Sequence, residues 1–167
     1  MVQVSEQALE QAGDQLAAVL KQQSRTIATA ESCTGGWVAK VLTDKAGSSE
    51  FMMAGLVTYS NEAKRAILGV EESALIEHGA VSEAVVRQMV AGAIKAANVD
   101  VAVAISGIAG PGGGSEGKPV GTVWFAWGVE GERTEASVKR FDGDRNEVRR
   151  QAVLYVLQGV AEFLRTL

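Results

Sequence analysis

The spacing of apolar residues along the chain predicts helices that alternate with short strands. Between Ala8 and Leu20 apolar side chains recur every three or four residues, which is typical of an amphipathic helix. The same spacing predicts further helices over residues 36–42, 61–68, 71–78 and 82–97, and from residue 144 to the end. Two of these helices are expected to stop at Gly69 and Gly79, because glycine readily adopts the left-handed conformation that ends a helix.

Short apolar and β-branched runs predict the strands. They cover residues 26–30, 51–59, 99–105, 120–129 and 133–141, and the last two are expected to form a hairpin. The run 99–105, VDVAVAI, is the most apolar of them and is expected in the middle of a sheet that is covered on both faces. This order predicts an α/β fold, a three-layer α/β/α sandwich with a mixed β-sheet. Without a linker or a repeat, residues 1–167 are expected to form a single domain.

Composition narrows the classes of protein that need to be considered. With a single cysteine, Cys33, the chain has no intrachain disulfide and no cysteine cluster for zinc, which suggests a reducing compartment such as the cytoplasm. The N-terminus lacks the basic start and apolar core of a signal peptide. No apolar run reaches the ~20 residues that a membrane span needs. A net charge of −4, with acidic and basic residues mixed, argues against a nucleic-acid partner.

Polar clusters follow several predicted strands, where ligands commonly bind in α/β sheets. The first is in TIATAESCTGGWVAK, residues 26–40, between a strand and a helix. Ser32 on such a turn can expose its hydroxyl beside free backbone N–H groups that stabilise an oxyanion. Alternatively, Ser32 or Thr34 is only a helix N-cap, which contributes about 1 kcal/mol. Cys33 is either a competing nucleophile or an inert buried thiol. The stretch by itself favours the cap.

A serine nucleophile needs a general base. His78 is the only histidine and lies at a predicted helix C-terminus, where a structural role suits it. Lys64 is the remaining candidate. If Asn61 caps the helix that follows, Lys64 falls in its first turn, where the helix dipole and partial burial would lower its pKa. Tyr59, at the end of the preceding strand, can relay a proton or orient the lysine. The alternative is that Lys64 is an ordinary solvated charge.

Two further segments carry candidate binding residues. Residues 112–118 fit the pattern G-x-x-x-x-G-K of a phosphate-binding loop, but Pro119 stands where a P-loop has Ser or Thr, which argues against an NTPase. A glycine-rich turn can still present successive N–H groups to an anion, or be a plain surface loop. Asp144 and Glu147 predict a capping box, which places Arg145 in the first helical turn and Arg149 one turn later. An arginine there can clamp a phosphate, or simply pair with neighbouring carboxylates.

Five motifs in order resemble the CinA C-terminal family, and in particular its stand-alone nicotinamide-nucleotide amidohydrolases. The motifs are AESCTGG at 30–36, YSN at 59–61 with Lys64, GAVS at 79–82, SGIAGPGG at 106–113 and KPVGTV at 118–123. The resemblance covers nearly the whole chain, from about residue 7 to the last helix.

The resemblance implies hydrolysis of the carboxamide of nicotinamide mononucleotide (NMN) to nicotinate mononucleotide and ammonia, in pyridine nucleotide salvage. It implies a mechanism with neither metal nor cofactor, in which Ser32 is the nucleophile, Lys64 its base and Tyr59 an assisting residue. Backbone N–H groups near residues 34–36 are expected to hold the oxyanion. It also implies a homo-oligomer, expected to be a dimer. The candidate substrate-binding residues are Glu31, Cys33, Thr34, Gly35, Gly36, Asn61, Ser106, Gly107, Gly110, Gly112, Gly113 and Arg145.

The alternative is a nucleotide- or partner-binding module without chemistry of its own, related to the larger competence- and damage-inducible CinA proteins. The joint presence of Ser32, Tyr59 and Lys64 speaks against it, because a pure binding module has no need for a base.

Overall fold

A five-stranded mixed sheet runs through the centre of the computed structural model, which describes residues 3–167. Its strands stand in the order β2-β1-β3-β4-β5. β1 pairs in parallel with β2 and β3, and the hairpin of β4 and β5 continues the sheet in antiparallel fashion from β3. The strands are β1 (Ile27–Glu31), β2 (Met52–Val57), β3 (Val101–Gly107), β4 (Thr122–Val129) and β5 (Thr134–Arg140). The apolar run at 99–105 therefore forms the central strand, as predicted.

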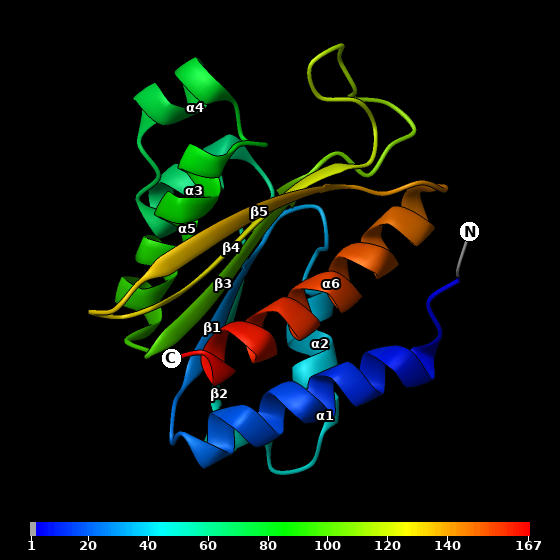
Figure 1. Cartoon of the computed structure of the whole chain (residues 1–167). Helices are drawn as coiled ribbons and strands as arrows, with labels where there is room; N and C mark the ends of the chain where they lie inside the picture. The colour runs from blue at the N-terminus through cyan, green and yellow to red at the C-terminus, as the bar shows by residue number, and fades with distance from the viewer. Residues whose placement is uncertain (1–2) are drawn as a thin grey trace.

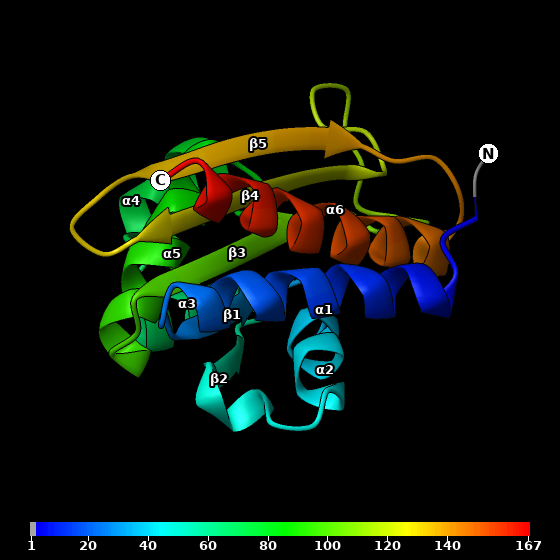
Figure 2. The same ribbon diagram turned by 60° about the horizontal axis from the view of Figure 1, so that its bottom comes forward.

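Helices cover both faces of this sheet, so the predicted three-layer α/β/α sandwich is confirmed (Figures 1 and 2). The first layer contains α1 (Glu6–Gln22), α2 (Trp37–Asp44) and α6 (Arg145–Arg165). The second contains α3 (Asn61–Leu68), α4 (Glu72–His78) and α5 (Glu83–Ala97). A short 3-10 helix, η1 (Ser48–Glu50), precedes β2.

The pleat of β3 divides the core into two apolar clusters. Val101, Val103 and Ile105 pack into the cluster on the α1/α2/α6 side, whereas Ala102 and Ala104 pack into the cluster on the α5 side. Successive side chains of a strand point to opposite faces, which accounts for the division. The same alternation continues to the ends of β1 and β3, where it decides which polar side chains face which helical layer.

Local capping signals account for most helix boundaries. Asp144 and Glu147 form the predicted capping box of α6, and the side chain of Ser82 caps α5. One prediction is wrong by a residue, because Ser60 and not Asn61 caps α3. The Ser60 hydroxyl accepts a hydrogen bond from the N–H of Ala63 at 3.0 Å. Lys64 is consequently the fourth residue of α3 rather than the third.

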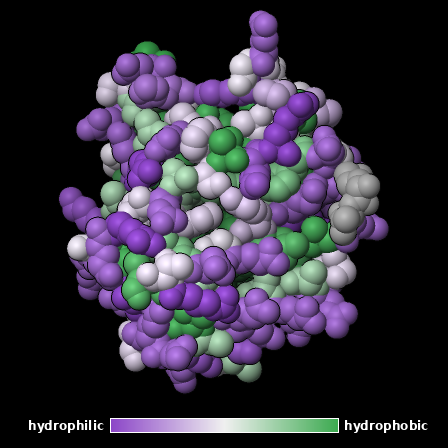
Figure 3. Space-filling model, in the orientation of Figure 1, coloured by the Kyte–Doolittle hydropathy of each residue, from purple (hydrophilic) through white to green (hydrophobic). Residues whose placement is uncertain are grey.

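The surface is mainly polar on the face seen in Figure 3, with small apolar patches between charged side chains. Among the described residues, no helix is long and apolar enough to cross a membrane.

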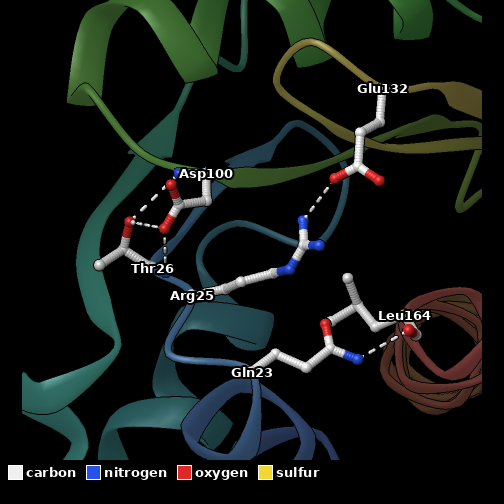
Figure 4. A network of polar contacts seen from close by, with 6 residues as sticks. All are labelled: Gln23, Arg25, Thr26, Asp100, Glu132 and Leu164. Carbon is white, nitrogen blue, oxygen red and sulfur yellow. Dashed lines mark hydrogen bonds and ion pairs between the residues drawn. The ribbon is translucent and has the colours of Figure 1, made fainter. Parts of the chain in front are cut away.

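A polar network ties β1 to β3 at the end of the sheet where both strands begin (Figure 4). The carboxylate of Asp100 accepts hydrogen bonds from the backbone N–H of Thr26 at 2.8 Å and from its hydroxyl at 3.1 Å. In return, the Thr26 hydroxyl accepts from the N–H of Asp100 at 3.1 Å. Nearby, Arg25 pairs with Glu132 in the turn between β4 and β5 at 2.9 Å.

Asp100→Ala is expected to lower the free energy of unfolding by about 1–3 kcal/mol, since it leaves half-buried donors of Thr26 without their acceptor. Urea unfolding followed by circular dichroism measures the change. Glu116→Ala, on the exposed loop after β3, is the matched control and is expected to change stability by less than about 0.5 kcal/mol. Equal midpoints for the two variants would contradict this role of Asp100.

Candidate active site

The carboxyl ends of three parallel strands bring the candidate residues together. Glu31, the last residue of β1, stands opposite Val57 of β2 and Ile105 of β3. The next residue on each strand is therefore a neighbour of the others, which places Ser32 between Thr58 and Ser106. The N–H of Ser32 donates to the carbonyl of Ile105 at 3.0 Å, extending the pairing by one residue. The predicted strand-end site is thus one row of hydroxyl side chains.

Ser32 and Lys64 form the centre of this site. The Nζ of Lys64 lies 3.0 Å from the Oγ of Ser32, 2.9 Å from the carbonyl of Thr58 and 3.2 Å from the carbonyl of Tyr59. Lys64 is 1% exposed and Ser32 is 8% exposed. All three partners of the amino group are neutral. Because burial disfavours the ammonium form, the pKa of Lys64 is lowered from its ordinary value.

This geometry suits a lysine that acts as a general base. A neutral amine has two N–H donors and one lone pair. In the structure Nζ donates to the Oγ of Ser32, and the Ser32 hydroxyl donates to the carbonyl of Tyr59 at 3.4 Å. When Lys64 is neutral and its two N–H groups stay on the carbonyls of Thr58 and Tyr59, its lone pair is directed at Ser32 and can accept the hydroxyl proton. Hydrogen-bond contact with a base of lowered pKa is what an activated serine requires. Lys64 is therefore not a solvated helix charge.

Cys33 follows the nucleophile candidate but is in a different chemical state. It is 7% exposed, and burial raises the pKa of its thiol to about 11. A thiol with that pKa is protonated at neutral pH, and the protonated thiol is a poor nucleophile. The hydroxyl of Ser32, and not the thiol, is the group that Lys64 contacts.

The role of Glu31 is structural, contrary to its placement among the substrate-binding residues. Its side chain is completely buried, and its carboxylate accepts hydrogen bonds from the hydroxyls of Thr29 and Thr34 at 3.1 and 2.7 Å. It also accepts from the backbone N–H groups of Val38 and Ala39, at 2.9 and 3.0 Å. These are N–H groups of the first turn of α2, where a carboxylate is favourable for the helix dipole. Glu31 therefore caps α2 from the preceding strand.

The alternative prediction, that Ser32 or Thr34 is the N-cap of α2, is wrong because Glu31 supplies the capping bonds. The N-cap residue of α2 is Gly36, which has no capping side chain. Thr34 is fully buried with its hydroxyl donated to Glu31, so its side chain does not face a ligand, and the hydroxyl of Ser32 is at Lys64. Glu31 and Ser32 are consecutive, so their side chains point to opposite faces of the sheet. One faces α2 and the other faces α3.

The turn that follows Ser32, residues 32–36 and here called the nucleophile turn, carries free backbone donors. The N–H of Gly35 donates to the carbonyl of Ser32 at 3.0 Å, so that donor is occupied. Within residues 3–167, the N–H groups of Thr34 and Gly36 have no acceptor, which leaves them available for an oxyanion. Gly35 and Gly36 have φ angles of +61° and +99°, a region that strongly favours glycine.

Arg145 joins the glycine-rich loop to Tyr59. Its guanidinium donates to the carbonyl of Gly110 at 2.8 Å and to the hydroxyl of Tyr59 at 3.1 Å. Tyr59 is exposed, its carbonyl accepts a hydrogen bond from the Nζ of Lys64, and its hydroxyl accepts one from Arg145. The sequence predicts that Tyr59 relays a proton or orients the lysine, and in the structure its main chain makes the contact. The exposed guanidinium of Arg145 has further donors for an anion at this edge.

The other candidates differ in how close they lie to Ser32. Ser106 is buried beside it at the end of β3, and Asn61 is exposed at the start of α3. Gly107 is required by space, because a Cβ there would lie 2.7 Å from the side chain of Val123. Gly112 and Gly113 are exposed in the loop that projects from the sheet between β3 and β4 (Figure 1). No group of three or more His, Cys, Asp or Glu side chains in the part of the chain that the structure describes is arranged to hold a metal.

Arg149 is a site residue that the sequence indicated only in general terms. It donates to the backbone carbonyls of Cys33 and Thr34 at 2.9 and 3.3 Å, so it binds the nucleophile turn itself. In the sequence, the only feature that pointed to Arg149 was its position one helical turn after Arg145. Spacing alone did not distinguish a ligand for phosphate from a ligand for the main chain.

Comparison with known proteins identifies relatives over almost the whole chain. The family described as the CinA C-terminal domain matches residues 9–164. The nicotinamide-nucleotide amidohydrolase PncC of Escherichia coli K12 is 59% identical over 152 residues, which are 90% of this chain and 91% of that protein. A CinA-like protein of Akkermansia muciniphila is 48% identical over 87% of this chain but only 35% of its own length. The crystal structure of a CinA superfamily protein from Klebsiella pneumoniae superposes with a TM-score of 0.92 at 42% identity, covering 95% of this chain and 99% of that one.

Proposed function

Because the chain belongs to the CinA C-terminal domain family, we propose that it hydrolyses the carboxamide of NMN to nicotinate mononucleotide and ammonia. Pyridine nucleotide salvage is the pathway that this reaction serves. The observation that carries the proposal is the contact between the buried Nζ of Lys64 and the Oγ of Ser32. The named activity of the Escherichia coli relative, at 59% identity, supplies the substrate.

The first half of the reaction forms an acyl-enzyme. Neutral Lys64 takes the hydroxyl proton of Ser32 while the Oγ attacks the carboxamide carbon. The oxyanion of the tetrahedral intermediate accepts hydrogen bonds from the free N–H groups of Thr34 and Gly36. Lys64, now an ammonium, passes its proton to the departing amino group. The C–N bond breaks, ammonia leaves, and the nicotinoyl group remains as an ester on Ser32.

The second half uses the same groups on water. Lys64 is neutral again after ammonia has left, and it takes a proton from a water molecule that attacks the ester carbon. The ester bond to Ser32 breaks, its Oγ recovers the proton from Lys64, and nicotinate mononucleotide leaves. Arg145, with Tyr59 and Gly110 as its partners, is placed to bind the anionic part of the substrate at the open edge of the site.

Incubation of the purified protein with NMN, without added metal, tests the proposal directly. Ammonia and nicotinate mononucleotide are expected in equal amounts, whereas ATP is expected to release no phosphate. Wild-type protein that binds NMN and releases neither product would instead support a non-catalytic binding module.

Cys33→Ala is expected to retain most of this activity, because the thiol is protonated at neutral pH and has no part in the proton transfers. Initial rates of ammonia release at saturating NMN provide the measurement. Loss of activity comparable to that of a Ser32 variant, in a protein with an unchanged melting temperature, would assign the nucleophile to a thiolate.

A further inference from the structure

We propose that Arg149 is a positioning residue that orients and polarises the N–H group of Thr34 in the nucleophile turn, one of the two donors assigned to the oxyanion, and that it is not a ligand for the substrate. The inference rests on the amidase function proposed above. It concerns a guanidinium on the face of the sheet opposite to Lys64, where no step of the reaction takes place.

The contacts of Arg149 are with the main chain. Its Nε donates to the carbonyl of Cys33 at 2.9 Å and its Nη2 to the carbonyl of Thr34 at 3.3 Å. The guanidinium is a rigid planar fork, so two bonds to consecutive carbonyls fix both peptide groups relative to α6.

The two hydrogen bonds from Arg149 also fix the direction in which the N–H groups of the same two peptide units point. In a trans peptide the C=O and the following N–H point in opposite directions. Holding the carbonyls of Cys33 and Thr34 toward Arg149 therefore turns the N–H groups of Thr34 and Gly35 away from it. Gly35 uses its N–H to close the turn onto Ser32. The N–H of Thr34 is left free, and a cation on the carbonyl of the same peptide group increases its strength as a donor.

Neighbouring residues hold the guanidinium in this position. It stacks on Trp37, with 5.5 Å between its central carbon and the ring centroid. It also fills the space beside Gly35, since a Cβ at that residue would lie 3.3 Å from Nη2. On the other side of the turn, Glu31 binds the hydroxyl of Thr34. Thr34 is thus fixed at its carbonyl by Arg149 and at its side chain by Glu31.

The location of Arg149 argues against contact with the substrate. It extends from α6 toward the start of α2, where it lines a hollow with Glu6, Trp37, Lys40 and the outer side of the nucleophile turn at Thr34, Gly35 and Gly36. The side chain of Ser32 instead faces α3, where Lys64 lies. Arg145, one turn earlier on α6, is the arginine that reaches the glycine-rich loop and Tyr59.

The test separates kcat from KM for NMN in Arg149→Lys and Arg149→Ala. Both variants are expected to lose about 10²-fold in kcat, the effect of losing one oxyanion donor. KM is expected to stay within about twofold, because ground-state binding is not changed. In both variants kcat is expected to rise with pH as it does in the wild type, because Lys64, the group whose loss of a proton causes the rise, is unchanged. Added guanidinium at millimolar concentration is expected to restore part of the activity of Arg149→Ala and none of that of an Arg145→Ala control.

Arg150→Ala is the matched control for packing. Arg150 is the next residue, also lies over Trp37 at 5.2 Å, and bonds to Val4 and Glu6 rather than to the nucleophile turn. Its kcat is expected to equal that of the wild type. If Arg149→Ala fails to fold, kcat and KM of Arg149→Lys, which retains the charge, provide the test. A raised KM with unchanged kcat would make Arg149 a substrate ligand and overturn the proposal, as would unchanged kinetics. A wild-type protein without ammonia release would contradict the amidase function itself.

Discussion

Ser32→Ala is expected to bind NMN and to release ammonia at least about 10⁴-fold more slowly than the wild type, as expected for loss of a nucleophile. The substitution removes the hydroxyl that contacts the Nζ of Lys64, while it leaves the turn intact. The backbone bonds of Ser32 to Ile105 and Gly35 do not depend on its side chain. Initial rates with NMN and isothermal titration with the same ligand measure the two quantities.

The acyl-enzyme provides a second readout for the same residue. Mass spectrometry of wild-type protein quenched in acid during turnover is expected to find a nicotinoyl adduct on the peptide that contains Ser32, and none in Ser32→Ala. Near wild-type turnover in Ser32→Ala would end the serine mechanism. An adduct on Cys33 would transfer the role to the thiol.

Much of the fold was predictable because helix boundaries are set by local signals. Gly69 and Gly79 end α3 and α4, and Ser82 and Asp144 begin α5 and α6 through bonds to N–H groups within three residues. Such signals are contained in a few adjacent residues, so they can be found without knowledge of the tertiary structure. The central position of β3 was likewise predictable, because only a strand covered on both faces is so uniformly apolar.

The site was only partly predictable, because its scaffold depends on contacts between distant elements. Glu31 was placed among the substrate-binding residues because its partners Val38 and Ala39 are seven and eight residues away, and only the strand pleat directs it at them. Tyr59 was expected to relay a proton or to orient the lysine, and nothing in the sequence indicated that its carbonyl is the atom that accepts from Nζ. A contact made by a backbone carbonyl does not depend on the type of side chain, so the sequence gives no sign of it. The same limitation applied to Arg149.

Ser32 and Glu31 show how one strand end supplies both chemistry and support. Adjacent residues on a strand face opposite ways, so the hydroxyl enters the layer of α3 and the carboxylate enters the layer of α2. A shift of one residue would exchange them and would put a buried carboxylate beside Lys64. That carboxylate would stabilise the ammonium form and raise the pKa of the base. The separation of Glu31 from Lys64 is therefore part of how the lysine stays available as a base.

Lys64→Met is expected to lower kcat for NMN by about 10²–10⁴-fold, the usual contribution of a general base. Methionine preserves the length and apolar character of the buried side chain. In the wild type, kcat/KM is expected to rise with pH as Lys64 loses its proton, with an apparent pKa below the ordinary 10.5 of lysine. That limb is expected to be absent from the residual activity of the variant. Lys95→Met, at an exposed lysine near the end of α5, is the matched control and is expected to keep both rate and pH profile.

Stability gives a readout of the same pKa that does not depend on catalysis. Because the folded-state pKa of Lys64 is lowered, the unfolded chain binds more protons between that pKa and 10.5. The contribution of this lysine to the free energy of unfolding therefore increases as pH rises through that window, and its penalty is complete below the folded-state pKa. Subtracting the pH profile of Lys64→Met from that of the wild type, both from urea unfolding, isolates the contribution. A flat difference across the window, with full activity in Lys64→Met, would show that the base is another group.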